Sequence, residues 1–444
     1  MPETGGWIFI IYSQAKKRKL LTNYLICRII ISEYCVLKGI YMNCFYKFYC
    51  RAFQTVFRLA LPILPYRDPK ILESVSQVPT ELLEIKKDSV LIVTDKTLHG
   101  LGMIDALKRH LSDNGIKYAV YDKTVPNPTV RNVEEARELY IQNACSAIIG
   151  FGGGSAIDCA KAVGARIARP KKPIAKMAGI LGVMHKLPFL IAVPTTAGTG
   201  SEVTLATVIT DADTGHKFPI SDFPLIPRVA VLDAENTKTM PLSMTSTTGM
   251  DALTHAVEAY IGRSTTRSTR KDATDAVRLI FENIETVYAD GGNLEARANM
   301  MKAAFLAGRA FSKSYVGYVH AVAHSLGGQY NIPHGLANAV LLPIVLEAYG
   351  KSVHKKLHEL AVVAGVALES DTHEQGAQKF IRAVKEMNER MNIPTTLSGI
   401  KKEDVPLMAS HAAKEANPLY PVPMLMDAKA LEEFYIKVAD WSKK

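Results

Sequence analysis

Five residues of the types that bind divalent cations fall in three short segments of the C-terminal half. Asp251 and His255 are four apart in a segment typical of a helix, so both side chains lie on one face. His320 and His324 repeat this spacing, and His334 follows in a short loop. A single histidine on a helix usually packs in a core. Four of the chain's twelve histidines at these spacings instead favour a metal site.

The residue types restrict the choice of metal. Imidazole and carboxylate groups without a thiolate suit Fe²⁺ or Zn²⁺, and both ions accept this set. An incomplete ligand shell leaves room for a substrate oxygen, so the ion would act as a Lewis acid on a carbonyl or an alkoxide.

Two loops rich in glycine and hydroxyl groups are suited to a phosphorylated ligand. Residues 152–155 (Gly-Gly-Gly-Ser) follow an apolar strand and open a helix, which presents backbone N–H groups to an anion. Residues 194–202 follow another apolar strand and contain two glycines and four hydroxyls. Those hydroxyls belong to Thr195, Thr196, Thr199 and Ser201. Two such loops at neighbouring strands would bind one dinucleotide from both sides.

Each of these features also has a purely structural interpretation. The alternative for the first loop is a tight turn in which Ser155 caps the helix and Asp158 is a carboxylate in its first turn. Asp95 ends a predicted strand, where a carboxylate accepts hydrogen bonds from a ribose diol and repels a 2′-phosphate. The alternative for Asp95 is an ordinary turn residue.

The elements that would position these residues change in kind along the chain. From residue 88 to 240, short apolar runs alternate with helical segments, a pattern typical of a parallel sheet covered by helices. The expected strands are residues 89–95, 117–122, 145–151, 188–196 and 229–236, and the expected helices are 101–115, 133–144 and 152–168. From 241 to 444 strand signals nearly vanish, so we expect an all-helical domain there.

Charge and cysteine content exclude several classes of protein. Residues 1–60 carry nine Lys or Arg and two Glu, a net +7 of the chain's +10, so the remainder is close to neutral and nucleic acid is not an expected partner. Four of the six cysteines lie in the first fifty residues, and no CxxC pair occurs. The chain is therefore expected in a reducing compartment, the cytoplasm.

The N-terminal residues differ in composition from the rest. Residues 20–41 are apolar but contain Arg28, Glu33 and Lys38, which disfavours a membrane-spanning helix. We expect residues 1–41 to be an extension without a fold of its own, with Met42 as a plausible start. Residues 42–87 are expected to form a basic, aromatic helix and a linker.

An apolar stripe at helical spacing follows Met42. Its members are Phe45, Phe48, Ala52, Val56 and Ile63, and basic residues lie between them. We expect this stripe to pack on its own domain and a membrane to be an improbable partner. The alternative is a basic amphipathic helix lying on a membrane surface.

Four motifs in order resemble those of the iron-containing (group III) alcohol dehydrogenases. They read GGGSAIDCAK, PTTAGTGSEVT, GMDALTHAVEAY and HAVAHSLGGQYNIPHGLANAVLLP, and the resemblance covers residues 88–444. It implies a Rossmann-like, dehydroquinate-synthase-like α/β domain followed by an all-α domain. It also implies hydride transfer between NAD(P) and a small alcohol or aldehyde in a homodimer or larger homo-oligomer.

The resemblance also assigns residues. The implied metal ligands are Asp251, His255, His320 and His334, and His324 is implied as a proton relay or substrate contact. The implied cofactor contacts are Asp95, Asn127, Gly153, Gly154, Ser155, Thr195, Thr196 and Lys217, to which we add Asp158 and Thr199 from the same loops. Aspartate at position 95 implies a preference for NAD over NADP.

Two other functions remain possible at this stage. A metal- and NAD-dependent lyase of the dehydroquinate synthase type shares the architecture, but it requires a cluster of Lys and Arg for an acidic substrate. The segment from His320 to His334 contains neither residue type. A non-catalytic assembly module would not need the complete set of ligand residues.

Overall fold

The computed structural model describes residues 44–212 and 217–442. The expected extension at residues 1–41 lies outside the described residues. The chain divides into two compact units, residues 1–47 and 48–444. Of the first unit, only the four residues at the start of helix α2 (Cys44–Ala60) are described, so the account below concerns the second.

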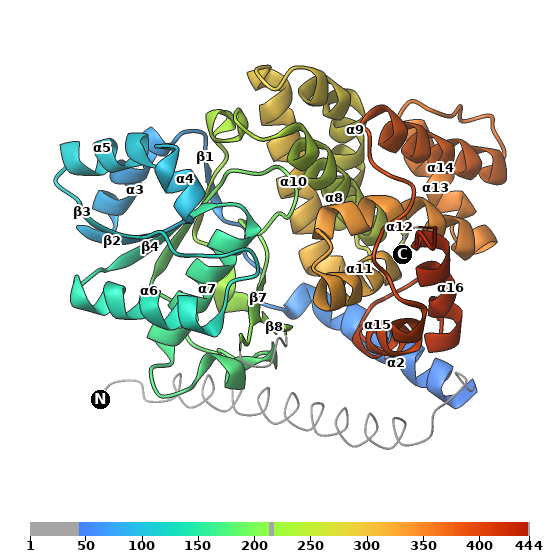
Figure 1. Cartoon of the computed structure of the whole chain (residues 1–444), viewed down its shortest axis with the longest axis horizontal. Coiled ribbons are helices and arrows are strands. Elements are labelled where there is room, and N and C mark those ends of the chain that lie inside the picture. Colours follow the sequence, from blue (N-terminus) through green and yellow to red (C-terminus); the bar gives the residue numbers. More distant parts are fainter. Residues whose placement is uncertain (1–43, 213–216, 443–444) are drawn as a thin grey trace, which may run out of the picture. The chain divides into compact units, whose positions relative to one another are not determined.

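The α/β part is built on a six-stranded sheet in which every strand pair is parallel (Figure 1). In order across the sheet, the strands are β1 (Lys70–Leu72), β9 (Val229–Val231), β6 (Phe189–Pro194), β4 (Ala147–Gly152), β2 (Ser89–Val93) and β3 (Lys117–Tyr121). The central strands β2 and β4 are buried along their whole length. Continuous apolar runs are typical of parallel strands covered on both faces, so the predicted fold class is confirmed.

Helices cover both faces of this sheet and generate two separate cores. The helices are α3 (Val78–Glu84), α4 (Lys96–Gly100), α5 (Asp105–Asp113), α6 (Val130–Gln142) and α7 (Gly154–Ala168). On one face Leu91 packs in a cluster with Val133 of α6 and Val163 of α7. On the other, Val90 packs in a cluster with Leu107 of α5. Adjacent residues of β2 thus serve opposite cores, as the alternation of a strand requires.

The sheet begins before the expected domain start at residue 88. Strand β1 pairs with β9, with Lys70 opposite Val229, and α3 follows it, both within the stretch expected to be helix and linker. A second small sheet, also not expected, has the order β5 (Gly179–Ile180), β8 (Lys217–Ser221), β7 (Ala206–Thr210). Strand β5 has only two residues, and β7 and β8 bury alternate residues, so none of the three gives a continuous apolar run in the sequence.

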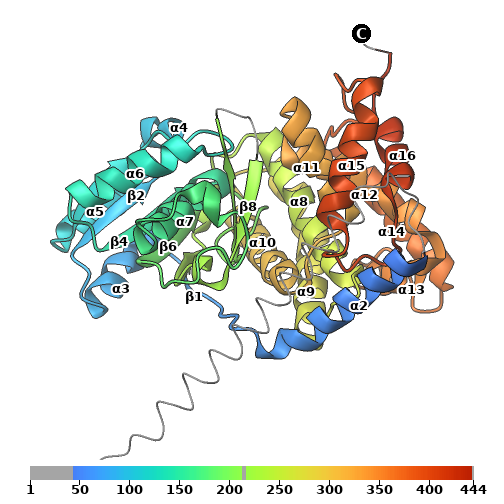
Figure 2. The same ribbon diagram turned by 90° about the horizontal axis from the view of Figure 1, so that it is seen from below.

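The described residues beyond β9 are predominantly helical and share one core (Figure 2). The helices are α8 (Leu242–Ile261), α9 (Arg267–Ala289), α10 (Leu294–Ser314), α11 (Tyr318–Tyr330), α12 (His334–Tyr349), α13 (His354–Val363), α14 (His373–Arg390), α15 (Val405–Ala416) and α16 (Ala428–Val438). Helix α8 is buried along almost all of its last three turns because α9, α10 and α12 pack around it. Side chains carried by α8 are therefore held rigidly.

Helix α12 continues through a proline. Pro343 has no N–H to donate, so the carbonyl of Ala339, one turn earlier, loses its partner within the helix. The buried side chain of Asn388 on α14 replaces it, donating through Nδ2 to the Ala339 oxygen at 2.8 Å. A side chain of α14 thus supplies the hydrogen bond that the backbone of α12 lacks at this position.

The apolar stripe of α2 does not pack as expected. Phe45, Phe48, Val56 and Ile63 are between 55% and 87% exposed, and Ala52 is exposed as well. The opposite face is buried instead, because Gln54 donates to the carbonyls of Pro418 and Tyr420 and holds that face against the chain. The expectation that this stripe joins the core was wrong.

Within the described residues, no helix is both long enough and apolar enough to cross a membrane.

Candidate functional site

Asp251, His320 and His334 converge from three helices. Their ligand atoms all lie within 4.8 Å of one another. The Asp251 Oδ1 atom is 3.7 Å from His320 Nε2 and 3.5 Å from His334 Nε2. Asp251 and His320 are only 2% exposed, whereas the His334 side chain is 38% exposed. The cluster is thus closed on the α8 and α11 sides and open beside α12.

The local backbone explains why His334 reaches the other two. Helix α11 ends at Asn331, which has a left-handed φ of 54° and turns the chain sharply into α12. Helix α12 then starts directly against α8, because a Cβ at Gly335 would lie 2.5 Å from the Thr247 oxygen. Only glycine allows this approach, which sets His334 over Asp251.

Asn338, a residue that sequence reasoning missed, lies at the centre of the cluster. Its Nδ2 atom donates to Asp251 Oδ1 at 2.7 Å and is 3.2 and 3.1 Å from the Nε2 atoms of His320 and His334. An amide NH₂ has two hydrogens, so it cannot satisfy three acceptors at once. Its own Oδ1 is buried without a partner among the described residues.

These observations test whether the residues fit a divalent cation. One carboxylate oxygen and two imidazole nitrogens lie within 4.8 Å of one another, and Oδ1 of Asn338 beside them is buried without a partner among the described residues. Burial by itself would raise the pKa of Asp251, but the histidines around it hold that pKa well below its ordinary value. An ionised, buried carboxylate facing imidazoles is the donor set of an iron or zinc site, and the residues fit the group.

Glu258, also missed from the sequence, orients His320. Its Oε2 atom accepts from His320 Nδ1 at 2.6 Å and from the Gly317 N–H at 2.8 Å, and its Oε1 accepts from the Val319 N–H at 2.9 Å. Burial alone would lower the pKa of His320, but its hydrogen bonds to Asp251 and Glu258 raise that pKa to about 9. The bond at Nδ1 leaves Nε2 directed at Asp251, as in many metal-bound histidines.

His255 lies beside the cluster, but the structure does not place it with the other three. Its ring stacks between those of Phe311, with centroids 4.1 Å apart, and His320, with centroids 4.5 Å apart. Its Nδ1 is buried and has no hydrogen-bond partner within residues 44–212 and 217–442. Burial lowers the pKa of His255 to about 3, so the ring is neutral and able to bind a cation.

His324 lies on the open side of the cluster. Its ring stacks on that of His334 with centroids 5.1 Å apart, and its side chain is 39% exposed. Nδ1 of His324 is 2.6 Å from Glu415 Oε1, which also accepts from the Tyr420 hydroxyl at 2.7 Å. Burial would raise the pKa of Glu415, but His324 and Tyr420 lower it overall. The chain therefore fixes Nδ1 and leaves Nε2 free of this bond.

The two glycine-rich loops meet at the carboxyl ends of neighbouring strands. Gly152 ends β4 opposite Pro194 of β6, and its carbonyl accepts from the Thr195 N–H at 3.1 Å. The φ of Gly152 is 147°, which side chains rarely adopt. The next two glycines face threonines of the other loop: a Cβ at Gly153 would be 3.4 Å from Thr196, and one at Gly154 3.0 Å from Thr199.

Three further expected contacts border these loops. The Asn127 N–H, on a backbone with φ of 59°, donates to Ser155 Oγ at 3.4 Å. Asp95 follows β2, and its Oδ1 accepts from the Leu98 N–H at 3.0 Å, so it caps α4. Its other oxygen would be 3.9 Å from a Cβ at Gly152, so the carboxylate also borders the glycine turn. Such a position, beyond the carboxyl ends of parallel strands, is where nucleotides bind.

Asp158 and Lys217 are bonded within the protein instead. Asp158 accepts from the Val208 N–H at 2.9 Å and from Ser201 Oγ at 3.4 Å, and burial raises its pKa to about 6. It therefore ties α7 to β7, and its contact with the cofactor stays a prediction. Lys217 Nζ donates to the Gly327 carbonyl of α11 at 3.1 Å. Sequence could not reveal these partners, because both belong to elements distant along the chain.

The second loop also contacts the helices that carry the metal-site residues. A Cβ at Gly198 would lie 2.5 Å from the Thr248 oxygen of α8, and one at Gly200 would lie 2.7 Å from the Gly308 Cα of α10. Backbone therefore packs on backbone at both points. The same helix α8 supports the loop and carries Asp251, so the expected cofactor site and the cation cluster share one rigid support.

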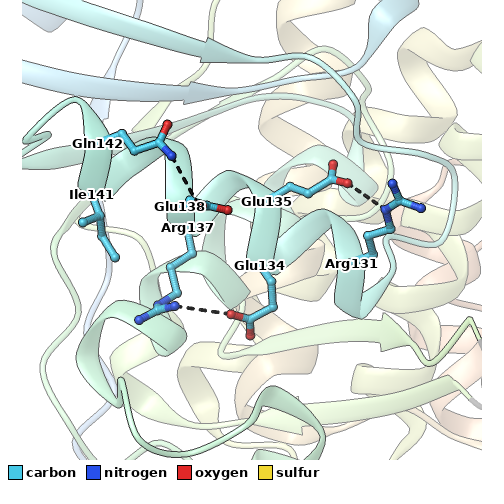
Figure 3. Close-up of a pocket in the computed structure, with 7 residues that line it drawn as sticks. All are labelled: Arg131, Glu134, Glu135, Arg137, Glu138, Ile141 and Gln142. Atoms are coloured by element: carbon cyan, nitrogen blue, oxygen red, sulfur yellow. Dashed lines mark hydrogen bonds and ion pairs between the residues drawn. The ribbon is translucent and has the colours of Figure 1, made fainter.

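The pocket shown in Figure 3 is unrelated to these residues. It lies along the outer face of α6 and is lined by charged side chains that pair with one another, Arg131 with Glu135 and Arg137 with Glu134. Pairs of this kind at helical spacing are typical of a solvated helix face. We assign no function to this pocket.

Comparison with known proteins gives a consistent result along most of the chain. Residues 72–234 match the family described as iron-containing alcohol dehydrogenase, and residues 245–438 match the C-terminal part of the same family. The chain is 40% identical over 341 residues to 1,3-propanediol dehydrogenase of Klebsiella pneumoniae, covering 76% of this chain and 87% of that protein. It is 38% identical over 323 residues to NADPH-dependent butanol dehydrogenase of Clostridium saccharobutylicum, covering 72% and 82%. A crystal structure of 1,3-propanediol oxidoreductase superimposes with a TM-score of 0.81 at 36% identity, covering 84% of this chain and 99% of that one.

Proposed function

The chain belongs to the iron-containing alcohol dehydrogenase family, and from this premise we propose that it interconverts small alcohols and aldehydes with NAD(H). Its class as an alcohol or aldehyde oxidoreductase follows from the family. The lyase activity considered from the sequence is not favoured, because the family and its named relatives are dehydrogenases. The substrate class and the nicotinamide cofactor are the parts that we propose.

We assign the metal to Asp251, His320 and His334, with His255 as fourth ligand. The observation that carries this assignment is that one carboxylate oxygen and two imidazole nitrogens, from three helices, lie within 4.8 Å of one another. The unpartnered Nδ1 of His255 supports its inclusion, since the protein gives that buried atom no other role among the described residues. A divalent cation bound there supplies Lewis-acid polarisation of a carbonyl, which makes the carbon a better hydride acceptor.

The protein's own side chains position the reactants and the proton. Glu258 fixes His320 through Nδ1, so the nitrogen aimed at the cluster cannot turn away. Glu415 holds His324 in the same manner, and the free Nε2 of His324 is the atom that we propose exchanges a proton with the substrate oxygen. Because His324 is partly exposed, its ring also connects the site with solvent.

The cofactor proposal depends on the two loops and Asp95. The Gly153 and Gly154 backbone would approach the pyrophosphate, with Ser155 and the hydroxyls of Thr195 and Thr196 as further donors. Family membership does not decide between the two cofactors, since one relative at 38% identity is named as NADPH-dependent. The carboxylate of Asp95 beside the glycine turn favours NADH, because it would repel a 2′-phosphate.

Location and assembly are further parts of the proposal. The described cysteines Cys44, Cys145 and Cys159 are free, which supports a reducing compartment such as the cytoplasm. We propose a homodimer or larger homo-oligomer, as the resemblance implied, and light scattering of the purified chain tests it.

Anaerobic purification followed by metal analysis tests the proposed function. The protein should contain iron or zinc and oxidise NADH with a panel of short aldehydes that includes 3-hydroxypropanal. Turnover without metal, or metal without turnover on any aldehyde or alcohol, would contradict the proposal.

A further inference from the structure

Helix α2 exposes a continuous apolar face that the dehydrogenase site does not use. We define the α2 face as Phe48, Ala52, Val56 and Leu59 of α2 together with Ile63 of the 3-10 turn Leu61–Ile63 that follows it. Phe48, Leu59 and Ile63 are 74%, 74% and 77% exposed, and Val56 is 55% exposed. Isolated exposed apolar residues are common, but a stripe of this length marks a surface that binds something.

The helix is held so that this face remains outward. Arg51 donates to the Val422 carbonyl at 2.7 Å and to the Pro423 carbonyl at 2.9 Å, and Gln54 is bonded to the same segment. Phe53 and Cys50 are buried on that side. Rotating α2 to bury the stripe would break these charged and buried hydrogen bonds, so the exposed orientation is fixed by the protein.

A group of basic side chains borders the α2 face. Arg263, whose N–H donates to the Pro421 carbonyl, lies next to the segment that binds Arg51. Arg58, Arg263 and Arg270 are exposed, and Lys356 Nζ donates to the carbonyls of Ile261 and Gly262, directly before Arg263. Burial lowers the pKa of Lys356 to about 8, and the positive charges of Arg270, Arg263 and Arg58 lower it in the same direction. The negative charge of Glu359 raises this pKa, but only in part. Helix α2 itself contains three basic residues and no Asp or Glu.

We propose that the α2 face docks the enzyme on an anionic membrane surface. An amphipathic helix with Phe, Leu and Ile on one face and Arg and Lys beside it lies in the headgroup region with its apolar side inserted. Each basic residue near an anionic leaflet adds to the attraction. The basic side chains that border the α2 face complement the negative charge of such a surface. This charge complementarity is why we propose an anionic membrane as the partner of the α2 face.

The same charge argues against the two other candidates. Two copies meeting through their α2 faces would bring Arg58 and its basic neighbours against their own counterparts. Residues 1–43 contain six Lys or Arg and two Glu, so covering the face with them would also bring like charges together. Neither occupant gains the attraction that an anionic bilayer provides.

Vesicle flotation of the full chain tests the proposal. The protein should float with vesicles of phosphatidylcholine and phosphatidylglycerol at low ionic strength, and much less with phosphatidylcholine alone or at high salt. Val56→Glu should weaken partitioning about tenfold, because it places a charge on the inserted face. The matched control is Ile141→Glu on α6, a residue with the same 55% exposure and no part in the α2 face, which should bind as the parent does.

A second variant tests the charge separately from the apolar stripe. Arg58→Gln with Arg270→Gln should reduce binding by about fivefold per charge while leaving the α2 face intact. All variants should keep the parent's aldehyde reductase rate in solution, which shows that they are folded and separates this proposal from the proposed function.

Three outcomes would overturn it. The first is that the full chain does not float with anionic vesicles, and the second is that Val56→Glu floats as well as Ile141→Glu. The third is that light scattering shows Val56→Glu breaking an oligomer which the control keeps, because the face would then be a contact between copies. If a chain that begins at Met42 floats but the full chain does not, the first outcome applies. Residues 1–41 would then be identified as the segment that covers the α2 face.

Discussion

The two halves of the site position their ligands by different means. In the α/β half, the proposed cofactor surface consists mostly of backbone, with Gly153 and Gly154 facing threonines of the second loop. In the helical half, the cation cluster consists of side chains, each held by another side chain, as Glu258 holds His320. A backbone surface tolerates changes of side chain as long as no Cβ intrudes. A cluster of side chains depends on each member and on the residue that orients it.

The largest effect is expected in the cluster itself. His334→Ala should reduce turnover by roughly a hundredfold or more and lower the bound metal, because the three remaining proposed ligands hold an ion poorly. Metal analysis and steady-state rates measure both effects. His110→Ala on α5, far from the site, is the matched control and should behave as the parent. Stoichiometric metal and near-normal turnover in His334→Ala would show that the ligand assignment is wrong.

The next effect concerns the residue that orients a ligand. Glu258→Gln should weaken metal affinity by about tenfold to a hundredfold, because the amide no longer fixes Nδ1 of His320 as a charged acceptor does. Titration with metal under anaerobic conditions measures the affinity. Excess metal should restore much of the rate in Glu258→Gln but not in His334→Ala. Equal failure of both variants to recover would mean that Glu258 does more than orient His320.

In the α/β half, the one charged side chain proposed to select the cofactor is Asp95. Asp95→Asn keeps the cap on α4, since asparagine caps as well as aspartate, but it removes the charge. The ratio of kcat/KM for NADH over NADPH should fall about tenfold, from a parent value that favours NADH. The same ratio should fall further in Asp95→Gly, because this change also removes the acceptor for the ribose hydroxyl. An unchanged ratio in both variants would leave Asp95 as a capping residue only.

The smallest effect is expected at Gly154 and tests whether a Cβ there is unfavourable only because it would contact Thr199. Gly154→Ala should raise KM for NADH about fivefold, equivalent to about 1 kcal/mol, since its Cβ would lie 3.0 Å from Cγ2 of Thr199. Adding Thr199→Ser removes that methyl group and keeps the hydroxyl, so KM should return toward the parent value. A KM that does not recover would locate the effect in the backbone of α7 rather than in contact with Thr199.

The sequence allowed the main sheet and the helical half to be predicted, for identifiable reasons. The strands β2, β4 and β6 are buried on both faces and therefore read as continuous apolar runs. Strand β1 has three residues, two of them exposed, and leaves no such signal. For α2, periodicity revealed an apolar face but could not reveal that the opposite face is the buried one. That choice depends on carbonyls of residues 418–423, which are distant along the chain.

The site was predicted in part, for similar reasons. Asp251, His320 and His334 have spacings and types that indicate metal binding, and the structure brings them together. Glu258 and Asn338 were missed, although each lies one or two helical turns from a proposed ligand, because glutamate and asparagine are common at such positions. The bonds of Asp158 to Ser201 and Val208 could not be predicted, since helix spacing does not show which neighbouring strand a first-turn carboxylate meets.

The proline in α12 ties together positions that change in different parts of the sequence. With Pro343 present, loss of Asn388 would leave the Ala339 carbonyl buried without a donor, a cost of about 1–3 kcal/mol. Without Pro343, the helix would supply that donor itself and Asn388 would be free to vary. The asparagine can therefore vary only where the proline is absent, so related chains that keep the proline should keep the asparagine as well.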